Sequence, residues 1–357
     1  LKQAPRAWYD RLTVFLTQVG FQRGGVDKTL FIGENGQDIL IIQVYVDDII
    51  FGGTSQSMVD EFVKTMTSEF EMSMVGELSY FLGLQVKQLD DGITVSQSTY
   101  AKNLIKRFGM QTSKTANTPM STTTKLSRDE DGKPVDEKLY RAMIGSLLYL
   151  TASRPDLCLS VGICARYQAN PKESHMNAVK RVIKYVKGTL DFGLHYTFET
   201  NVNLAGFCDA DWAGCLDDRH STSGGCFFLG NNLVAWHSKK QNCVSLSTAE
   251  AEYIALGSCC TQLLWMRQML VDYGIISDPM LVHCDNMSAI NLSKNPVQHS
   301  RTKHVDIRHH FVRELVEMKI VILEHVSTER QLADLFTKPL DYNTFLGLRK
   351  ALGIVNL

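Results

Sequence analysis

The sequence predicts a multidomain protein of the α/β and α+β classes that ends in a mixed β-sheet flanked by helices. The chain has 357 residues, which at about 150 residues per domain gives two or three domains. A polar, Thr/Ser-rich stretch at 113–137 separates an early zone of mixed strands and helices from a helical one. Strand and helix patterns then alternate over residues 201–345.

Four zones follow from these changes in composition and pattern: residues 1–112 (mixed strands and helices), 113–200 (linker and helical region), 201–345 (alternating strands and helices) and 346–357 (C-terminal tail). Within the second zone, Leu139–Ala152 and His175–Lys187 are predicted helices. The first ends before Ser153-Arg154-Pro155, and the second ends at Gly188.

The composition is that of an ordinary globular protein, with 44% hydrophobic residues, 21% charged residues and 8 prolines. The formal net charge of −1 excludes a protein that holds nucleic acid by bulk positive charge, so any such contact is expected to be local. The nine cysteines include no C-x-x-C pair, which indicates reduced thiols rather than a zinc ribbon.

The sequence contains no signal-peptide pattern at its start and no apolar run of about 18 residues. We therefore expect an intracellular protein that is neither secreted nor inserted in a membrane. The first residue is Leu1 rather than Met, and we expect the chain to be a piece of a longer protein.

The alternating zone opens with three predicted strands. The first, Val202–Cys208, ends directly before Asp209. The other two, Gly225–Leu229 and Leu233–His237, flank Gly230-Asn231-Asn232, which is typical of a hairpin turn.

A helix and a further strand follow this hairpin. Ser247-Thr248-Ala249-Glu250 is a capping box, which opens a helix that runs to about Asp272. Met280–Cys284 is then a strand, and it ends directly before Asp285.

The last predicted elements are a strand at Ile320–Val326 and a helix that carries Asp334. A second capping box, Thr328-Glu329-Arg330-Gln331, opens this helix. The resulting order, βββ-α-β-α-β-α, predicts a mixed sheet with helices on its faces.

Four acidic residues of this zone lie where a fold has little use for a charge. Asp209 and Asp285 follow apolar strands, at the edge where α/β sheets bind ligands. Glu252 and Asp334 lie in helices that must pack on the sheet, where a charge is costly unless it is paired or bound to a metal. Four convergent carboxylates would hold two Mg²⁺ ions about 3.5–4 Å apart, which clamp the attacking and leaving oxygens of a phosphodiester.

We therefore predict that Asp209, Glu252, Asp285 and Asp334 are catalytic metal ligands for Mg²⁺, with Mn²⁺ as the alternative ion. The competing interpretation is that each acid is a solvated surface charge. Glu250 competes with Glu252, but the capping box already explains Glu250, so we favour Glu252. Asp211 competes with Asp209, and we favour Asp209 because it directly ends the predicted strand.

Linked motifs in this zone resemble the RNase H domain of Ty1/copia-type retrotransposon polyproteins: FCDADWAG (207–214), DDRHSTSGG (217–225), WHSKKQ (236–241), STAEAEYIAL (247–256), VHCDNMSAI (282–290), KHVDIRHHFVREL (303–315) and HVSTERQLADLFTKPL (325–340). The resemblance implies an RNase H-like fold. It also implies that metal-activated water cleaves the RNA strand of an RNA–DNA hybrid, with the four acids as ligands. Cellular RNase H proteins have a His-bearing loop before their last helix, whereas His325 lies within a predicted strand, so we assign it no such role.

An earlier acidic pair, Asp47-Asp48, lies between two apolar strand-like runs in ILIIQVYVDDIIFGG (39–53). At the tip of a hairpin, both carboxylates would face a cleft, and the competing interpretation is an Asp-rich turn. Tyr45-Val46-Asp47-Asp48 resembles the palm signature of reverse transcriptases, which implies that Asp47 and Asp48 are catalytic metal ligands. LKQAPRAWYDRL (1–12) and YFLGLQV (80–86) are similar to copia-type segments of the same enzyme.

The resemblance identifies the zones as a partial reverse-transcriptase palm and thumb, a linker with a helical connection, and an RNase H domain. It implies another metal-binding Asp and nucleotide-binding fingers upstream of LKQAPRAW, so we expect no DNA polymerisation by this chain alone. The implied partners are an RNA–DNA hybrid, a template–primer and the remainder of the Pol polyprotein, in a cytoplasmic particle or the nucleus. The alternatives are a non-catalytic nucleic-acid-binding relic and a metal-dependent nuclease with another substrate.

Overall fold

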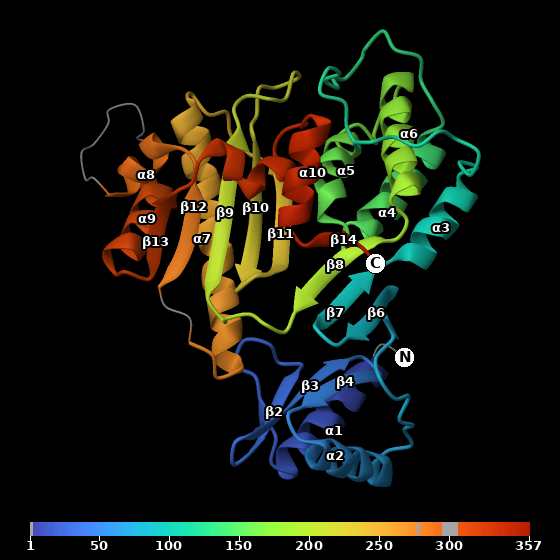
Figure 1. The fold of residues 1–357 in the computed structure, drawn as a ribbon, viewed down its shortest axis with the longest axis vertical. Coiled ribbons are helices and arrows are strands. Elements are labelled where there is room, and N and C mark those ends of the chain that lie inside the picture. The colour runs from blue at the N-terminus through green and yellow to red at the C-terminus, as the bar shows by residue number, and fades with distance from the viewer. Residues whose placement is uncertain (1–2, 277–278, 295–305) are drawn as a thin grey trace. The chain divides into compact units, whose positions relative to one another are not determined.

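The computed structural model describes residues 3–276, 279–294 and 306–357, except for the side chains of residues 306–310. The chain divides into two compact units, whose elements are labelled in Figure 1. Unit 1 comprises Leu1–Leu78 and Leu264–Ile276, and unit 2 comprises Ser79–Leu263 and Ser277–Leu357. The zone boundaries at residues 112, 200 and 345 do not coincide with this division and remain predictions.

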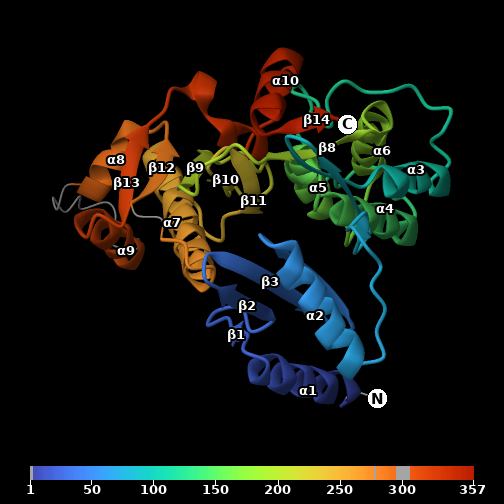
Figure 2. The ribbon, with the colours of Figure 1, turned by 60° about the horizontal axis from the view of Figure 1, so that its bottom comes forward.

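Unit 1 contains a four-stranded antiparallel sheet in the order β1-β2-β3-β4 and two helices that pack on it (Figure 2). Its elements are α1 (Ala4–Gln18), β1 (Gln22–Arg23), β2 (Leu30–Asn35), β3 (Asp38–Tyr45), β4 (Asp48–Gly53) and α2 (Gln56–Glu69). Leu16 of α1, Ile42 of β3 and Phe62 of α2 are buried in one core. This arrangement confirms the expected mixture of strands and helices.

The first part of unit 2 combines short strands with a group of helices. Its elements are β5 (Tyr80–Phe81), β6 (Leu84–Leu89), β7 (Gly92–Ser96), α3 (Ser98–Arg107), α4 (Glu137–Leu150), the 3₁₀ helix η1 (Pro155–Leu157), α5 (Cys158–Ala165), α6 (Glu173–Gly188) and β8 (Phe192–Thr197). Helices α4 and α6 confirm the two predicted helices, with slightly different ends. The side chain of Asp136 caps α4, accepting a hydrogen bond from Leu139 N–H at 3.0 Å.

No helix or strand forms between α3 and α4, which confirms the predicted long loop. The loop is nevertheless held on α6. Arg181 donates to the carbonyl and the hydroxyl oxygen of Thr118, at 3.2 and 2.9 Å, and Lys187 Nζ donates to the carbonyl of Ser113 at 2.6 Å. Leu126 is buried in the core of unit 2, so even this polar stretch contributes an apolar anchor.

The second part of unit 2 contains a mixed five-stranded sheet in the order β11-β10-β9-β12-β13. Its elements are β9 (Leu204–Asp211), β10 (Thr222–Leu229), β11 (Asn232–Lys240), α7 (Thr248–Asp272), β12 (Met280–Cys284), α8 (Met287–Lys294), α9 (Asp306–Glu317) and β13 (Val321–His325). Helix α7 begins in unit 2, and its residues from Leu264 onward belong to unit 1. Strands β9, β10 and β11 are antiparallel, whereas β9, β12 and β13 are parallel. The mixed sheet flanked by helices is therefore confirmed (Figure 1).

Two glycines of this sheet show which segment covers each of its faces. A side chain at Gly206 of β9 would meet Cys259 of α7, whereas a side chain at Gly224 of β10 would meet Phe336. Gly224 lies opposite Asp209 in the ladder. Because successive residues of a strand point to opposite faces, Cys208 faces the side of α7 and Asp209 faces the side of Phe336.

The segment after β13 differs from the prediction of an α-helix opened by a capping box at Thr328. It forms two 3₁₀ helices, η3 (Thr328–Arg330) and η4 (Leu332–Phe336). The Thr328 hydroxyl donates to the carboxylate of Asp285 at 3.0 Å and does not cap the helix. Pro339 follows closely after η4 and disfavours its extension.

Residues 346–357, predicted as a C-terminal tail, lie in α10 (Tyr342–Ala351) and β14 (Ile354–Asn356). Strand β14 pairs with β8 and completes an antiparallel sheet in the order β14-β8-β7-β6-β5. This segment therefore belongs to the fold of unit 2.

A hydrogen-bond network around a buried ion pair joins α10 to the helical part of unit 2. Arg154 and Asp156 lie 2.8 Å apart, and each is at most 2% exposed. Tyr185 donates to Asp156 at 2.6 Å and accepts from Arg349 of α10 at 2.9 Å. Since loss of one partner of a buried pair typically costs about 3–5 kcal/mol, this network fixes α10 and the segment before it.

Candidate metal centre

Asp209 lies within β9 and is 1% exposed. The prediction that it directly follows the strand was wrong, because pairing with β10 continues to Asp211 opposite Thr222. Thr337 donates a hydrogen bond from its hydroxyl to Asp209 Oδ2. Asp211 is occupied elsewhere, since its carboxylate accepts from the backbone N–H of Thr222.

Asp285 directly follows β12, as predicted. Its Oδ2 accepts a hydrogen bond from Thr328, and its carbonyl oxygen lies 3.2 Å from His325 Nε2. His325 is the last residue of β13, so it lies within the strand, as the sequence indicates. Asp285 is partly exposed, which leaves it open to solvent ligands.

Glu250 and Glu252 have different roles near the start of α7. The Glu250 carboxylate accepts from Leu246 N–H at 2.7 Å, and Ser247 Oγ accepts from Glu250 N–H at 3.2 Å. Glu250 thus serves the start of the helix, although its backbone partner is Leu246 rather than Ser247. Glu252 is 6% exposed and lies beside Cys284 and Asp285.

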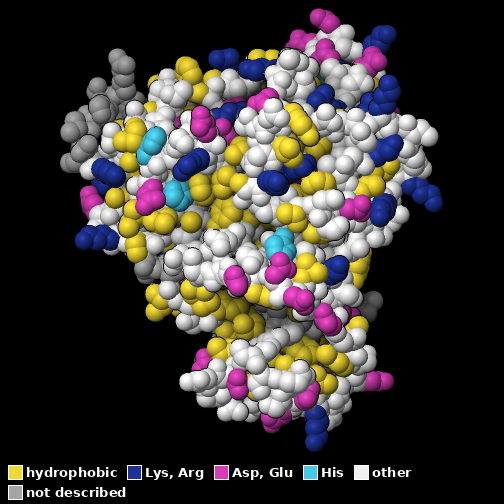
Figure 3. Space-filling view, viewed as in Figure 1, with side chains coloured by type: hydrophobic (Ala, Val, Ile, Leu, Met, Phe, Trp, Pro, Cys, Tyr) yellow, Lys and Arg dark blue, Asp and Glu magenta, His cyan; other side chains and the backbone are white. Residues whose placement is uncertain are grey.

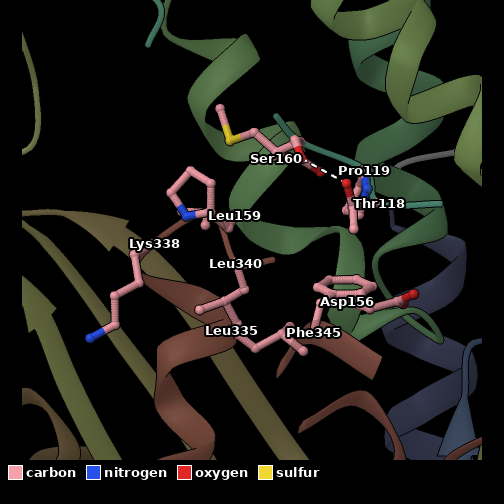
Figure 4. Close-up of a pocket in the computed structure, with 11 residues that line it drawn as sticks. Thr118, Pro119, Asp156, Leu159, Ser160, Leu335, Lys338, Leu340 and Phe345 are labelled. Carbon is pink, nitrogen blue, oxygen red and sulfur yellow. Dashed lines mark hydrogen bonds between the residues drawn. The ribbon is translucent and has the colours of Figure 1, made fainter. Parts of the chain in front are cut away.

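Asp334 lies in η4, is 4% exposed and is accompanied by a lysine that the sequence analysis missed. Lys338 Nζ lies 2.9 Å from Asp334 Oδ1 and 3.6 Å from Asp209 Oδ2. The i, i+4 spacing of Asp334 and Lys338 in ADLFTKPL was the available signal. In Figure 4 the Lys338 ammonium points away from a small cavity that Leu335 and Phe345 line.

The four acids predicted from the sequence come together in two overlapping groups. In one, ligand atoms of Asp209, Asp285 and Asp334 all lie within 4.8 Å of one another. In the other, atoms of Glu252, Cys284 and Asp285 meet the same limit. Asp285 belongs to both groups and links them.

The electrostatics of these groups favour a bound cation. Burial and the nearby carboxylate of Asp209 raise the pKa of Glu252 well above its usual range. Burial and Asp209 also raise the pKa of Asp334, although Lys338 partly opposes the shift. Burial alone would lower the pKa of Lys338, but Asp209 and Asp334 raise it.

One buried oxygen supports the interpretation that this centre holds a ligand. Glu252 Oε2 is fully buried and has no hydrogen-bond partner among the described residues. A buried acceptor without a partner is unfavourable by about 1–3 kcal/mol, and more if it is charged. Clustered carboxylate oxygens are the ligands that Mg²⁺ and Mn²⁺ prefer, so these residues fit a hard divalent cation.

The other predicted acids, Asp47 and Asp48, lie in unit 1 at the tip of the β3–β4 hairpin, as predicted. Both are exposed, and the strands beside them are buried on one face at most. Among the residues that the structure describes, neither joins a group able to hold a metal. Val46 has φ +55°, a strained conformation for a β-branched residue, and its carbonyl accepts from Trp8 Nε1 at 2.8 Å.

The remaining motifs add little to this centre. The stretch 303–315 begins outside the described residues, and the side chains of its residues 306–310 also lie outside them. On the face shown in Figure 3, Lys and Arg side chains are interspersed with Asp and Glu. This mixture agrees with the net charge of −1.

Comparisons with known proteins give one matching family model and several relatives. A family model described as reverse transcriptase (RNA-dependent DNA polymerase) matches residues 1–122. The retrovirus-related Pol polyprotein from transposon RE2 of Arabidopsis thaliana is 38% identical over 100% of this chain and 25% of its own length. The chain belongs to the copia-type retrotransposon Pol polyproteins.

A second relative of this Pol polyprotein chain, from transposon TNT 1-94 of Nicotiana tabacum, is 32% identical over 99% of the chain and 27% of its own length. The chain thus spans about a quarter of the length of these curated relatives. Among solved structures, LC11-RNase H1, isolated from compost, is similar with 15% identity and a TM-score of 0.31. The match covers 38% of this chain and 93% of that one.

Among the described residues of this chain, no helix has both the length and the apolar character needed to cross a lipid bilayer.

Proposed function

We propose that this Pol polyprotein chain hydrolyses the RNA strand of RNA–DNA hybrids, with Mg²⁺ or Mn²⁺ as the cofactor. The observation that carries the proposal is the convergence of Asp209, Glu252, Asp285 and Asp334 from four separate elements of unit 2. These acids come from β9, α7, η4 and the residue after β12. Such a buried concentration of negative charge has little structural purpose without a cation.

A bound pair of divalent ions would activate water and stabilise the leaving 3′ oxygen. The chain supplies the ligands and holds them in place. Asp285 would be shared between the two ions, because it belongs to both groups. The hydroxyls of Thr337 and Thr328 orient Asp209 and Asp285, and such outer-shell hydrogen bonds fix the direction of a ligand.

Lys338 would help to balance the charge of the centre. Its ammonium lies close to both Asp334 and Asp209, and its side chain is 38% exposed. It can therefore offset their repulsion before ions bind, and it can move toward solvent once they do. The ion pair of Arg154 and Asp156 supports this arrangement indirectly through α10.

Cleavage of a hybrid with a labelled RNA strand, with and without Mg²⁺, tests this function. We expect cleavage of the RNA strand that depends on Mg²⁺ or Mn²⁺. Binding of the hybrid without cleavage would instead support a non-catalytic relic of a retroelement. Preferential cleavage of duplex DNA would support a nuclease with a different substrate.

For unit 1, we propose that Asp47 and Asp48 belong to the metal site of an incomplete RNA-directed DNA polymerase that contacts a template–primer. The match of residues 1–122 to reverse transcriptases and the supported hairpin tip favour this role. The remainder of the Pol polyprotein would complete the site, in a cytoplasmic particle or the nucleus. Primer extension by this chain alone should therefore fail, and incorporation of nucleotides would contradict the proposal.

A further inference from the structure

The two groups at the metal centre differ in the chemistry of their ligands. Asp209, Asp285 and Asp334 offer only carboxylate oxygens, whereas the group of Glu252, Cys284 and Asp285 includes a sulfur. Oxygen ligands suit hard cations such as Mg²⁺, but a thiolate suits soft cations such as Zn²⁺ and Cd²⁺. The two positions are therefore unequal in the cations that they select.

The position of Cys284 follows from the alternation of β12. Met280, Val282 and Cys284 are buried, whereas Leu281 and His283 between them are less so. Cys284 consequently points to one face of the sheet, and its Sγ lies within 4.8 Å of ligand atoms of Glu252 and Asp285. The backbone N–H of Asn286 lies 3.4 Å from Sγ and orients it.

A second observation points independently to a ligand at this position. Glu252 is 94% buried, because its exposed fraction is 6%, and its Oε2 has no hydrogen-bond partner among the described residues. This oxygen belongs to the side chain that shares the group with Cys284. A cation held between the two would satisfy it.

We propose that Glu252, Cys284 and Asp285 form a binding site for a soft divalent cation of the Zn²⁺ and Cd²⁺ type. Three protein ligands and one open position are the usual ligand set of a zinc site that is open to solvent. Binding replaces the S–H bond of Cys284 with a sulfur–metal bond and releases one proton to solvent, with no change in oxidation state.

The soft-cation site has a consequence for hybrid cleavage. This consequence, unlike the binding of the cation, rests on the nuclease function proposed above. Asp285 cannot serve a soft cation in one group without changing its contribution to the other. A soft cation should therefore displace Mg²⁺ and inhibit cleavage. The binding itself does not depend on cleavage and can be measured without nucleic acid.

Cadmium titration of the metal-free full chain tests the proposal, with the ultraviolet charge-transfer absorption of a cadmium–thiolate bond as the readout. Cys243 is exposed and would bind cadmium by itself, so the titration uses a Cys243→Ser background. We expect the absorption to appear in this background and to be lost on Cys284→Ala. Glu252→Gln should weaken cadmium binding by about tenfold or more, as loss of even an outer-shell partner does.

Cys226→Ala is the matched control, because Cys226 is also fully buried in the same sheet but lies outside both metal groups of the described residues. It should retain the cadmium absorption. Cys284→Ser is closer in size to the native residue and replaces the alanine variant if circular dichroism shows that the latter unfolds.

Absorption that persists unchanged in the Cys284 variant would overturn the proposal, as would its absence from the Cys243→Ser protein. Failure of hybrid cleavage would leave this result intact. The soft-cation site and the nuclease function therefore fail in different experiments.

Discussion

Two acidic clusters of the chain resemble one another in sequence but differ in their surroundings. Asp47 and Asp48 form an exposed hairpin tip, whereas Asp209, Glu252 and Asp334 are each at most 6% exposed and lie near Asp285. Both clusters follow or interrupt apolar strands. Of the two, only the cluster in unit 2 brings together carboxylates whose oxygens are not all hydrogen-bonded by solvent or by neighbouring donors.

The difference indicates that convergence, rather than the presence of adjacent acids, marks a metal centre. An exposed carboxylate is hydrated and has little need of a cation. In the buried group, burial and then repulsion by the carboxylate of Asp209 raise the pKa of Glu252 and of Asp334, and a bound cation would relieve this repulsion. The following predictions compare the two clusters on this basis.

The largest effect is expected from Asp285→Asn, because Asp285 belongs to both metal groups. Hybrid cleavage should fall by more than the about 10–100-fold loss that follows removal of an outer-shell partner. The paired variant Asp47→Asn with Asp48→Asn should cleave at the wild-type rate. Equal losses in the two variants, measured with the same labelled hybrid, would remove the distinction between the clusters.

Glu252→Gln should stabilise the metal-free protein at neutral pH by about 1–3 kcal/mol, since it removes an ionisable group from a buried position. Glu252 has a raised pKa when folded, so its contribution to stability is complete below about pH 4.3 and is lost as pH rises through the raised value. Denaturant unfolding in a chelator should show wild-type stability falling as the pH rises from about 4.3 toward the folded pKa of Glu252, which is about 11. The free energy of unfolding of Glu252→Gln should decline less over this pH range. Parallel pH curves for the wild type and the variant would contradict the raised pKa of Glu252.

Lys338→Gln should destabilise the metal-free protein by about 1–2 kcal/mol, between the ranges for exposed and buried ion pairs. The effect should shrink in Mg²⁺, because the ions then neutralise Asp209 and Asp334. Thermal unfolding with and without Mg²⁺ measures both quantities. The matched control is Lys350→Gln, which replaces an exposed lysine of α10. It should change neither the stability of the metal-free protein nor the effect of Mg²⁺ on stability.

The smallest effect concerns the stability of the hairpin tip. Asp47→Asn with Asp48→Asn should change the free energy of unfolding by no more than about 0.5 kcal/mol, as is usual for surface substitutions. The measurement is denaturant unfolding in a chelator and again in Mg²⁺. A metal-dependent stability change in this variant would show that the tip binds a cation without further partners.

Most of the fold, and the convergence of four acids in unit 2, could be predicted, because strand and helix periodicity and capping residues are local signals. The end of β9 could not, since pairing with Thr222 extends that strand beyond Cys208. The α-helix expected at Thr328 did not form: the hydroxyl of Thr328 donates to Asp285, and two short 3₁₀ helices occupy this segment. These contacts join residues far apart in the sequence.

The contribution of Lys338 was missed for a similar reason. Its spacing from Asp334 was visible, but its approach to Asp209 depends on how η4 packs against β9. The pairing of β14 with β8 likewise depends on residues far apart in the chain. Sequence patterns predicted which acids to examine, and the packing of the sheet determined which of them converge.

Direct measurement of Mn²⁺ binding to the metal-free chain, by electron paramagnetic resonance of the unbound ion, tests the central comparison most directly. The wild type and the Asp47→Asn, Asp48→Asn variant should bind Mn²⁺ alike, whereas Asp285→Asn should lose this binding. Retention of wild-type binding by Asp285→Asn, with loss in the hairpin variant, would contradict the assignment of the metal centre to unit 2.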